Sequence, residues 1–168
     1  MMKEQTLWRF IMNQLTIQNF ELARSIFLKQ LDGMDEAAAD IQPHGFNNNI
    51  RWHIGHVLTT AEYFMFGFPK HSANLPTRYV ELFNRGTSPA DWKGEVPTLK
   101  ELKQQLEEQL ARVKEMPEER LFEKLEKPVF NLNTFGELVN FTVFHETNHF
   151  GQMHAIKRII ENQTAKQA

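Results

Sequence analysis

Cysteine is absent from this 168-residue sequence, and its absence excludes a whole group of sites. Disulfides, zinc fingers, thiolate clusters and cysteine nucleophiles all require that residue. A strong excess of one charge is also missing, because 19 Lys and Arg residues face 21 Asp and Glu residues, for a net charge of −2. A nucleic-acid-binding domain would show a positive excess. We therefore expect no nucleic-acid partner, and any transition metal must be bound by imidazole or carboxylate.

Long apolar segments are missing as well. No run approaches the roughly 18–20 apolar residues that a membrane span needs. The N-terminal stretch is interrupted by charged, Gln and Asn residues, unlike a signal peptide. We therefore expect a cytoplasmic protein with no membrane partner. With 41% hydrophobic and 24% charged residues, the sequence predicts one folded domain over residues 1–168.

Apolar residues recur at helical spacing in four long segments. Asp32 and Gly33 stop the first, and Asn47–Asn49 can cap the start of the second. Capping boxes open the third and fourth helices, at Thr98-Leu-Lys-Glu101 and at Thr134-Phe-Gly-Glu137. The four expected helices extend from near the N-terminus to Leu31, over Ile50–Phe68, from Thr98 to Pro117, and from Thr134 to about Asn162.

The connections between these helices differ in length. Residues 69–97 contain four prolines and two glycines, and we expect one short helix there, around Tyr79–Phe83. Such a length suits a crossover between distant helix ends. Residues 118–133 are expected to be a linker, and no segment alternates with the period of two that would indicate a strand. The sequence thus predicts an all-α protein, a four-helix bundle with a long crossover between its second and third helices.

Seven histidines are present, and two of them form a pair on the fourth helix. His145 and His149 lie four residues apart, so their directions differ by about 40° and both leave one face of the helix. Two imidazoles so placed can share a metal ion. The alternative is a pair that is hydrogen-bonded in the core, because apolar neighbours such as Phe141 and Met153 indicate a partly buried face.

The pair belongs to the sequence His145-Glu-Thr-Asn-His149, which matches the H-E-x-x-H pattern of zinc peptidases. Those enzymes need a third ligand. His154 lies about 140° around the helix from His149, on the wrong side. The one later acid, Glu161, lies about 18 Å along the same helix. We therefore do not expect a peptidase.

A third ligand should come from the second helix, which carries His53 and His56. The two histidines are three residues apart and occupy adjoining faces, so helical geometry alone does not choose between them. The remaining histidines, His44 and His71, flank this helix in irregular stretches and are expected to be solvated.

These features together resemble a known family. The second helix reads W-H-I-G-H-V-L-T-T-A-E and the last reads F-H-E-T-N-H-F-G-Q-M, and nearly the whole chain resembles the DinB/YfiT-like superfamily. That resemblance implies a four-helix bundle and a divalent metal held by three histidines, His56, His145 and His149. It leaves His53 and Glu146 with supporting roles. We expect zinc as the metal, with nickel as the second choice.

The resemblance also implies an activity. Three imidazoles leave a position open for water or a thiol substrate, as in catalytic metal sites. The function expected is that of a metal-dependent enzyme, a transferase that uses a low-molecular-weight thiol or a hydrolase. The alternative is a non-catalytic, stress-related metal-binding bundle that forms a dimer. A homodimer is expected in either case, because Phe64, Phe66 and Phe68 cannot all face one core unless the crossover folds over them.

Overall fold

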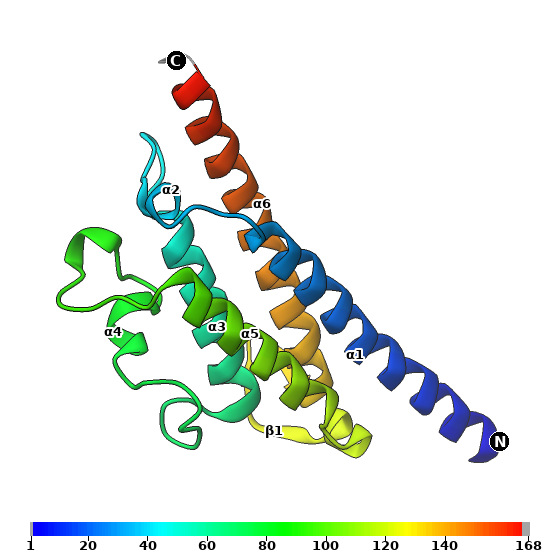
Figure 1. The fold of residues 1–168 in the computed structure, drawn as a ribbon. Helices are drawn as coiled ribbons and strands as arrows, with labels where there is room; N and C mark the ends of the chain where they lie inside the picture. The colour runs from blue at the N-terminus through cyan, green and yellow to red at the C-terminus, as the bar shows by residue number, and fades with distance from the viewer. Residues whose placement is uncertain (1, 166–168) are drawn as a thin grey trace.

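A computed structural model describes residues 2–165 of the chain, with side chains from Gln14 onward. Four long helices dominate it: α1 (Met2–Leu31), α3 (Ile50–Phe66), α5 (Leu99–Lys114) and α6 (Phe135–Ala165) (Figure 1). The short elements are α2 (Glu36–Asp40), α4 (Tyr79–Phe83), the 3-10 turns η1 (Pro89–Asp91) and η2 (Glu118–Phe122), and the strands β1 (Lys124–Val129) and β2 (Leu132–Thr134). The predicted all-α bundle is confirmed.

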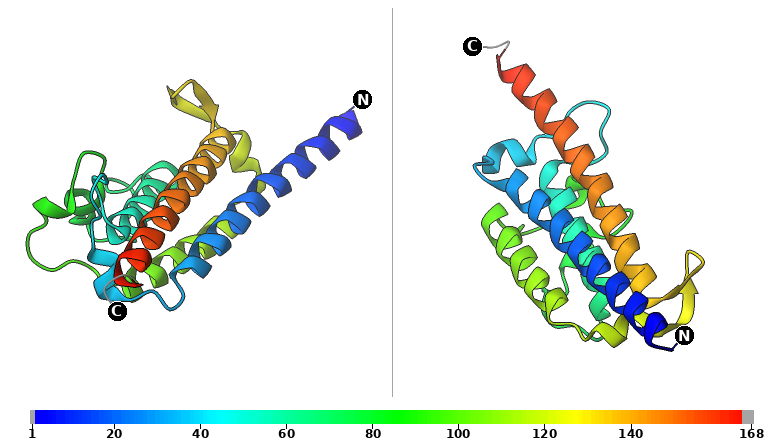
Figure 2. Two further views of the ribbon diagram at one scale, coloured as in Figure 1. Left: turned by 90° about the horizontal axis from the view of Figure 1, so that it is seen from above. Right: turned by 90° about the vertical axis from the view of Figure 1, so that its right-hand side faces the viewer.

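The direction of the helices explains the long crossover. Helices α1 and α6 run the same way, and α3 and α5 run the opposite way (Figures 1 and 2). Both α1 and α3 pack against α5 and α6, so each long helix has two neighbours. Because α3 and α5 are parallel, the chain must return along the whole bundle between them, and residues 67–98 make that return. Among the described helices, none combines the length and apolar character needed to cross a bilayer.

Local capping chemistry sets the helix boundaries. The Asn49 side chain accepts a hydrogen bond from the Trp52 amide, and Thr98 and Glu101 form the predicted capping box. Helix α3 ends at Phe66, two residues earlier than predicted. Gly67 follows it in the left-handed region at φ 72°, where glycine is favoured because it has no Cβ.

The prediction of an irregular linker over residues 118–133, without a strand, is wrong in one respect. The segment contains most of a β-hairpin. Strand β1 pairs antiparallel with β2, with Val129 opposite Leu132. The two turn residues, Phe130 and Asn131, both have positive φ, at 51° and 64°, as a two-residue hairpin turn of type I′ requires. Most side chains of β1 are exposed, so the apolar alternation that marks a half-buried strand is not visible in its sequence.

The three aromatic residues near the end of α3 pack in three different places. Phe68 is buried in the main core, which also contains Leu75 of the crossover. Phe66 packs on the second core cluster, with the Arg112 guanidinium over its ring at 5.2 Å. Phe64 is half-buried against Phe141. The three rings therefore do not form one interface, and homodimerisation stays a prediction.

A buried ion pair ties α1 to α6. The Arg24 side chain is fully buried, and its Nε and one terminal nitrogen donate to the two carboxylate oxygens of Glu146 at 2.8 and 2.9 Å. The guanidinium also donates to the Leu106 carbonyl and to the Gln109 side chain of α5, each at 3.0 Å. Three helices are thus joined through one side chain, and bidentate geometry fixes their relative orientation.

The same network continues to α3. Gln109 donates to the buried Glu62 carboxylate at 2.6 Å. That carboxylate also accepts hydrogen bonds from Ser72, Asn74 and Arg112. Burial raises the pKa of Glu62, but the four donors outweigh burial, and the pKa is held below its ordinary value. Glu62 is therefore ionised and satisfied inside the bundle.

Removing one member of the Arg24–Glu146 pair should be more damaging than removing both. We expect Arg24→Met and Glu146→Met each to lower the free energy of unfolding by about 3–5 kcal/mol, because each leaves a buried charge without its partner. The double variant should lose clearly less than the sum. Urea unfolding measures all three, with the exposed Arg158→Met as control, expected to change stability by about 0.5 kcal/mol or less. Additive losses would contradict the coupling.

Glu62 should make stability depend on pH. Its lowered pKa in the folded state means that it stabilises the fold above its ordinary pKa of 4.5, and that this contribution is lost as the pH falls below that value. We expect Glu62→Gln to cost about 3 kcal/mol at pH 7, because its amide would place a donor against donors. The gap to the wild type should narrow between pH 5 and more acidic conditions. Urea titrations at several pH values test this, with the exposed Glu115→Gln as control; a constant gap would contradict it.

Candidate metal centre

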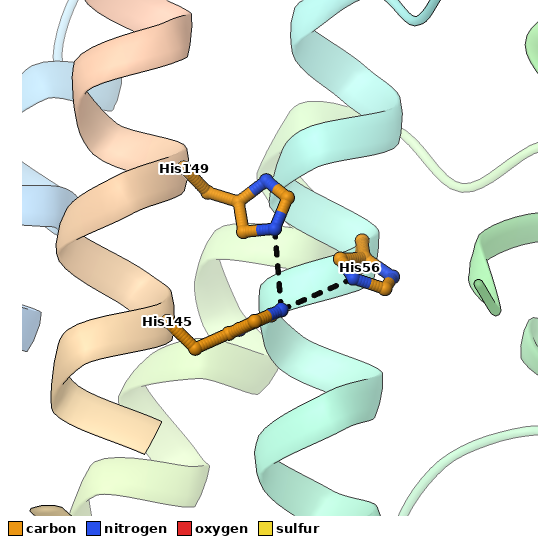
Figure 3. Close-up of side chains that lie close together, drawn as sticks. All are labelled: His56, His145 and His149. Atoms are coloured by element: carbon orange, nitrogen blue, oxygen red, sulfur yellow. Dashed lines mark hydrogen bonds between the residues drawn. The ribbon is translucent and has the colours of Figure 1, made fainter. Parts of the chain in front are cut away.

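Three histidines from two antiparallel helices converge between α3 and α6 (Figure 3). His145 Nε2 lies 3.1 Å from His56 Nε2 and 3.2 Å from His149 Nε2. These are the three residues named by the family resemblance, and the structure brings them together. His56 is buried, and the other two are half-buried. All three imidazoles therefore present the same ring nitrogen to one point.

The orientation of His56 is fixed from two sides. Its Nδ1 lies 2.6 Å from the Phe83 carbonyl, so Nδ1 carries the proton and Nε2 presents a lone pair. The Trp52 ring stacks on the imidazole, with centroids 4.4 Å apart and planes 13° from parallel. Gly55 permits this arrangement, because a Cβ there would lie 2.4 Å from the Phe83 ring. The close seating of α4 on α3 thus sets the tautomer of His56.

His53 contacts the cluster from outside it. Its Nδ1 lies 2.7 Å from Nδ1 of His149, on the side of that ring opposite the Nε2 that faces His145. One of the two Nδ1 atoms must donate and the other accept. When His149 uses Nε2 as a lone pair, its Nδ1 carries the proton and donates to His53. The supporting role expected for His53 is therefore geometrically available: it holds the ring of His149.

The charge state of the cluster favours a cation. Burial, together with the neighbouring imidazoles, lowers the pKa of His53 and of His145 to about 4 and that of His149 to about 2. Burial also lowers the pKa of His56, although the bond to the Phe83 carbonyl acts in the opposite direction. Neutral imidazoles are the form that binds metals.

Hydrogen bonding within the cluster cannot satisfy both short contacts. A neutral His145 has either a proton or a lone pair on Nε2, so it cannot donate to the His56 lone pair and also accept from His149. A cation bound by the Nε2 lone pairs of all three histidines removes this conflict, because no proton is then needed between the rings. The separations of 3.1 and 3.2 Å are close to the about 3.3 Å edge of a tetrahedral site with metal–nitrogen distances of roughly 2.0–2.1 Å. The residues present therefore fit a divalent metal better than the alternative of a hydrogen-bonded core pair.

Glu146 does not take part in the cluster. Although it follows His145 directly, it points to the other side of α6, where Arg24 binds it. This orientation removes the general base that the peptidase pattern requires. Of the other histidines, His44, His71 and His154 are all exposed. The prediction that His44 and His71 are solvated agrees with the structure.

A cavity of about 440 Å³ opens beside the cluster. Side chains of four segments line it, namely α3, the residues that follow α4, the hairpin turn and α6; they are His56, Thr60, Tyr63, Phe64, Asn84, Arg85, Phe130, Phe141 and His145. Its size falls in the range of roughly 300–1,000 Å³ for ligand pockets. Sequence reasoning missed Arg85 and Phe130, because they lie far from the histidines in the chain and match no motif.

The fold and the cluster define a class: a four-helix bundle with a three-histidine group between its second and fourth long helices. Residues 19–153 match the sequence profile of the DinB superfamily, and the chain belongs to that superfamily. The fold is also similar to the crystal structure of a conserved protein from Enterococcus faecalis, with a TM-score of 0.61 and 18% sequence identity over 89% of this chain and 96% of that one. A comparison with curated protein sequences finds no match.

The contact between His53 and His149 leads to a prediction about zinc binding. His53→Phe should weaken zinc binding by about 10- to 100-fold, because the ring of His149 loses the partner that orients it. His53→Gln should weaken it less, since the Gln amide oxygen can still accept the proton of Nδ1. Competition with a zinc-chelating dye measures the affinities, and the exposed His44→Phe serves as control. A His53→Phe variant with the zinc affinity of the wild type would refute the positioning role.

Proposed function

We propose that this protein is a metal-dependent enzyme in which His56, His145 and His149 hold one divalent ion, with zinc favoured and nickel second. One observation carries the proposal: the three Nε2 atoms converge, and two of the histidines, His56 and His145, line a cavity. When bound, such an ion would lower the pKa of a water or thiol in its remaining position. The family membership supports the same interpretation.

The residues around the site favour thiol transfer over hydrolysis. The described lining of the cavity contains no carboxylate, and the chain has no cysteine. A sulfur nucleophile must therefore arrive with the substrate, and the transferase that uses a low-molecular-weight thiol is our first choice. Hydrolysis by an activated water is the second. The non-catalytic bundle would require a site closed to small molecules, which the cavity beside His56 and His145 does not favour.

Metal analysis of the purified protein tests the first part of this proposal. We expect about one divalent ion per chain in the wild type and none in His56→Ala or His145→Ala, because two imidazoles do not replace three. His44→Ala and His71→Ala remove exposed histidines and should retain the ion. Wild-type protein that takes up no more metal than His56→Ala would refute the metal site.

A sample with cobalt in place of the native metal tests whether a thiol binds at the metal. Addition of N-acetylcysteine should change the visible spectrum of bound cobalt, because sulfur would enter its coordination. The same titration with N-acetylserine is the control, because this compound has a hydroxyl in place of the thiol of N-acetylcysteine. A stoichiometric metal whose spectrum does not respond to the thiol would contradict the thiol transferase and leave hydrolysis or a purely structural ion.

A further inference from the structure

The cavity beside the histidines has an unusual distribution of charge. Arg85 is the one formally charged residue in its described lining, and no acidic side chain is present to neutralise it. Among the described residues, no carboxylate pairs with the exposed Arg85 guanidinium. Other exposed cations among the described residues, such as Lys100 and Arg158, also have no carboxylate partner, but only Arg85 lies in the described lining of this cavity. An unpaired arginine on a cavity wall is a ready partner for an anion.

The backbone around Arg85 is held in place. The Phe83 carbonyl, two residues earlier, accepts the bond from His56 Nδ1. The Asn84 carbonyl accepts from both the backbone amide and the hydroxyl of Thr87, at 3.1 and 2.8 Å. The backbone that carries Arg85 therefore belongs to a turn that is anchored to a histidine of the cluster.

Another part of the cavity wall is apolar and aromatic, in contrast to the charged Arg85. Phe141 has its ring centroid 5.5 Å from that of Phe64 and 5.0 Å from that of Phe130, so the three rings form one apolar group. Phe130 contributes from the hairpin turn, at φ 51°, a position where Asn or Gly is favoured and a phenylalanine is strained. Phe130 is still 63% exposed, so folding gains little from burying it. A strained residue with an exposed ring at a cavity is the pattern expected of a binding residue.

We propose that this cavity binds a small molecule with a flat apolar body and an anionic group, the body against Phe64, Phe130 and Phe141 and the anion at Arg85. The inference rests on the proposed function, because the ligand would be the substrate presented to the three histidines. It adds the chemical class of that substrate. An arginine can hold a carboxylate through two parallel hydrogen bonds, and aromatic walls favour a planar body.

Three simple probes separate the two halves of the ligand. The probes are 2-naphthoate, which has both the body and the charge, 2-naphthalenemethanol, which lacks the charge, and acetate, which lacks the body. Calorimetric titrations should show 2-naphthoate binding at least tenfold more tightly than either of the others. The titrations are made with metal-free and with zinc-loaded protein. Metal-free protein is decisive, because there the carboxylate has no ion to coordinate.

Two variants test the named residues. Arg85→Gln should weaken 2-naphthoate binding about tenfold and leave 2-naphthalenemethanol unchanged, since the positive charge and one of the two parallel hydrogen bonds are lost while the Gln amide can still donate one. Phe130→Asn should weaken both aromatic probes severalfold while it leaves the unfolding midpoint equal or higher, because Asn suits the turn. The controls are Arg158→Gln on exposed α6 surface and Phe144→Ala, which removes a ring of similar exposure, 65%, that does not line the cavity.

The outcomes distinguish this inference from the proposed function. Arg85- and Phe130-dependent binding of 2-naphthoate to metal-free protein supports it, whether or not zinc binds. Zinc binding at one ion per chain, with 2-naphthoate affinities unaffected by both variants, overturns it and leaves the metal site intact. A Phe130→Asn variant that changes the sedimentation coefficient but not the probe affinities would also overturn it, because the aromatic group would then be an interface between two copies of the chain.

Discussion

The fold depends on the ion pair between Arg24 and Glu146, because it decides which way α6 faces. Consecutive residues of a helix point about 100° apart. When Glu146 is bound by Arg24 on the side of α1 and α5, His145 and His149 turn toward α3. A buried pair of charges adds little net stability, but it strongly disfavours any rotation that would separate them. The three-histidine group is therefore positioned from the far side of the helix that carries two of its members.

Helix α3 provides the other half of the site and is buried on almost all sides. Every residue from Ile50 to Thr59 is buried, because α5, α6 and the crossover with α4 cover it. A polar side chain in such a place needs a partner. Glu62 finds four donors, and His56 finds the Phe83 carbonyl and the two histidines of α6. The same burial that lowers the pKa of these imidazoles keeps them neutral and available to a cation.

The pattern H-E-x-x-H illustrates how far sequence reasoning reaches. The spacing of His145 and His149 predicts two imidazoles on one face, which the structure shows, since this follows from the helix alone. The role of Glu146 does not follow from spacing, because its partner lies 122 residues away in the chain. Local sequence also fails to indicate the hairpin at residues 124–134. Its strands are exposed, and a turn with positive φ at Phe130 and Asn131 has none of the usual glycine signal.

The sequence by itself determined what depends on neighbours within a few residues: the four long helices, their capping boxes, the long crossover, the histidine pair and the lack of any sulfur nucleophile in the chain. Helical geometry left His53 and His56 equivalent until the family resemblance chose His56. Only the tertiary structure decided the contacts that join His56 to α6, the direction of Glu146, and the placing of Arg85 and Phe130 on one cavity. These depend on how α6 is rotated and how α4 lies on α3, and contacts between segments far apart in the chain set both.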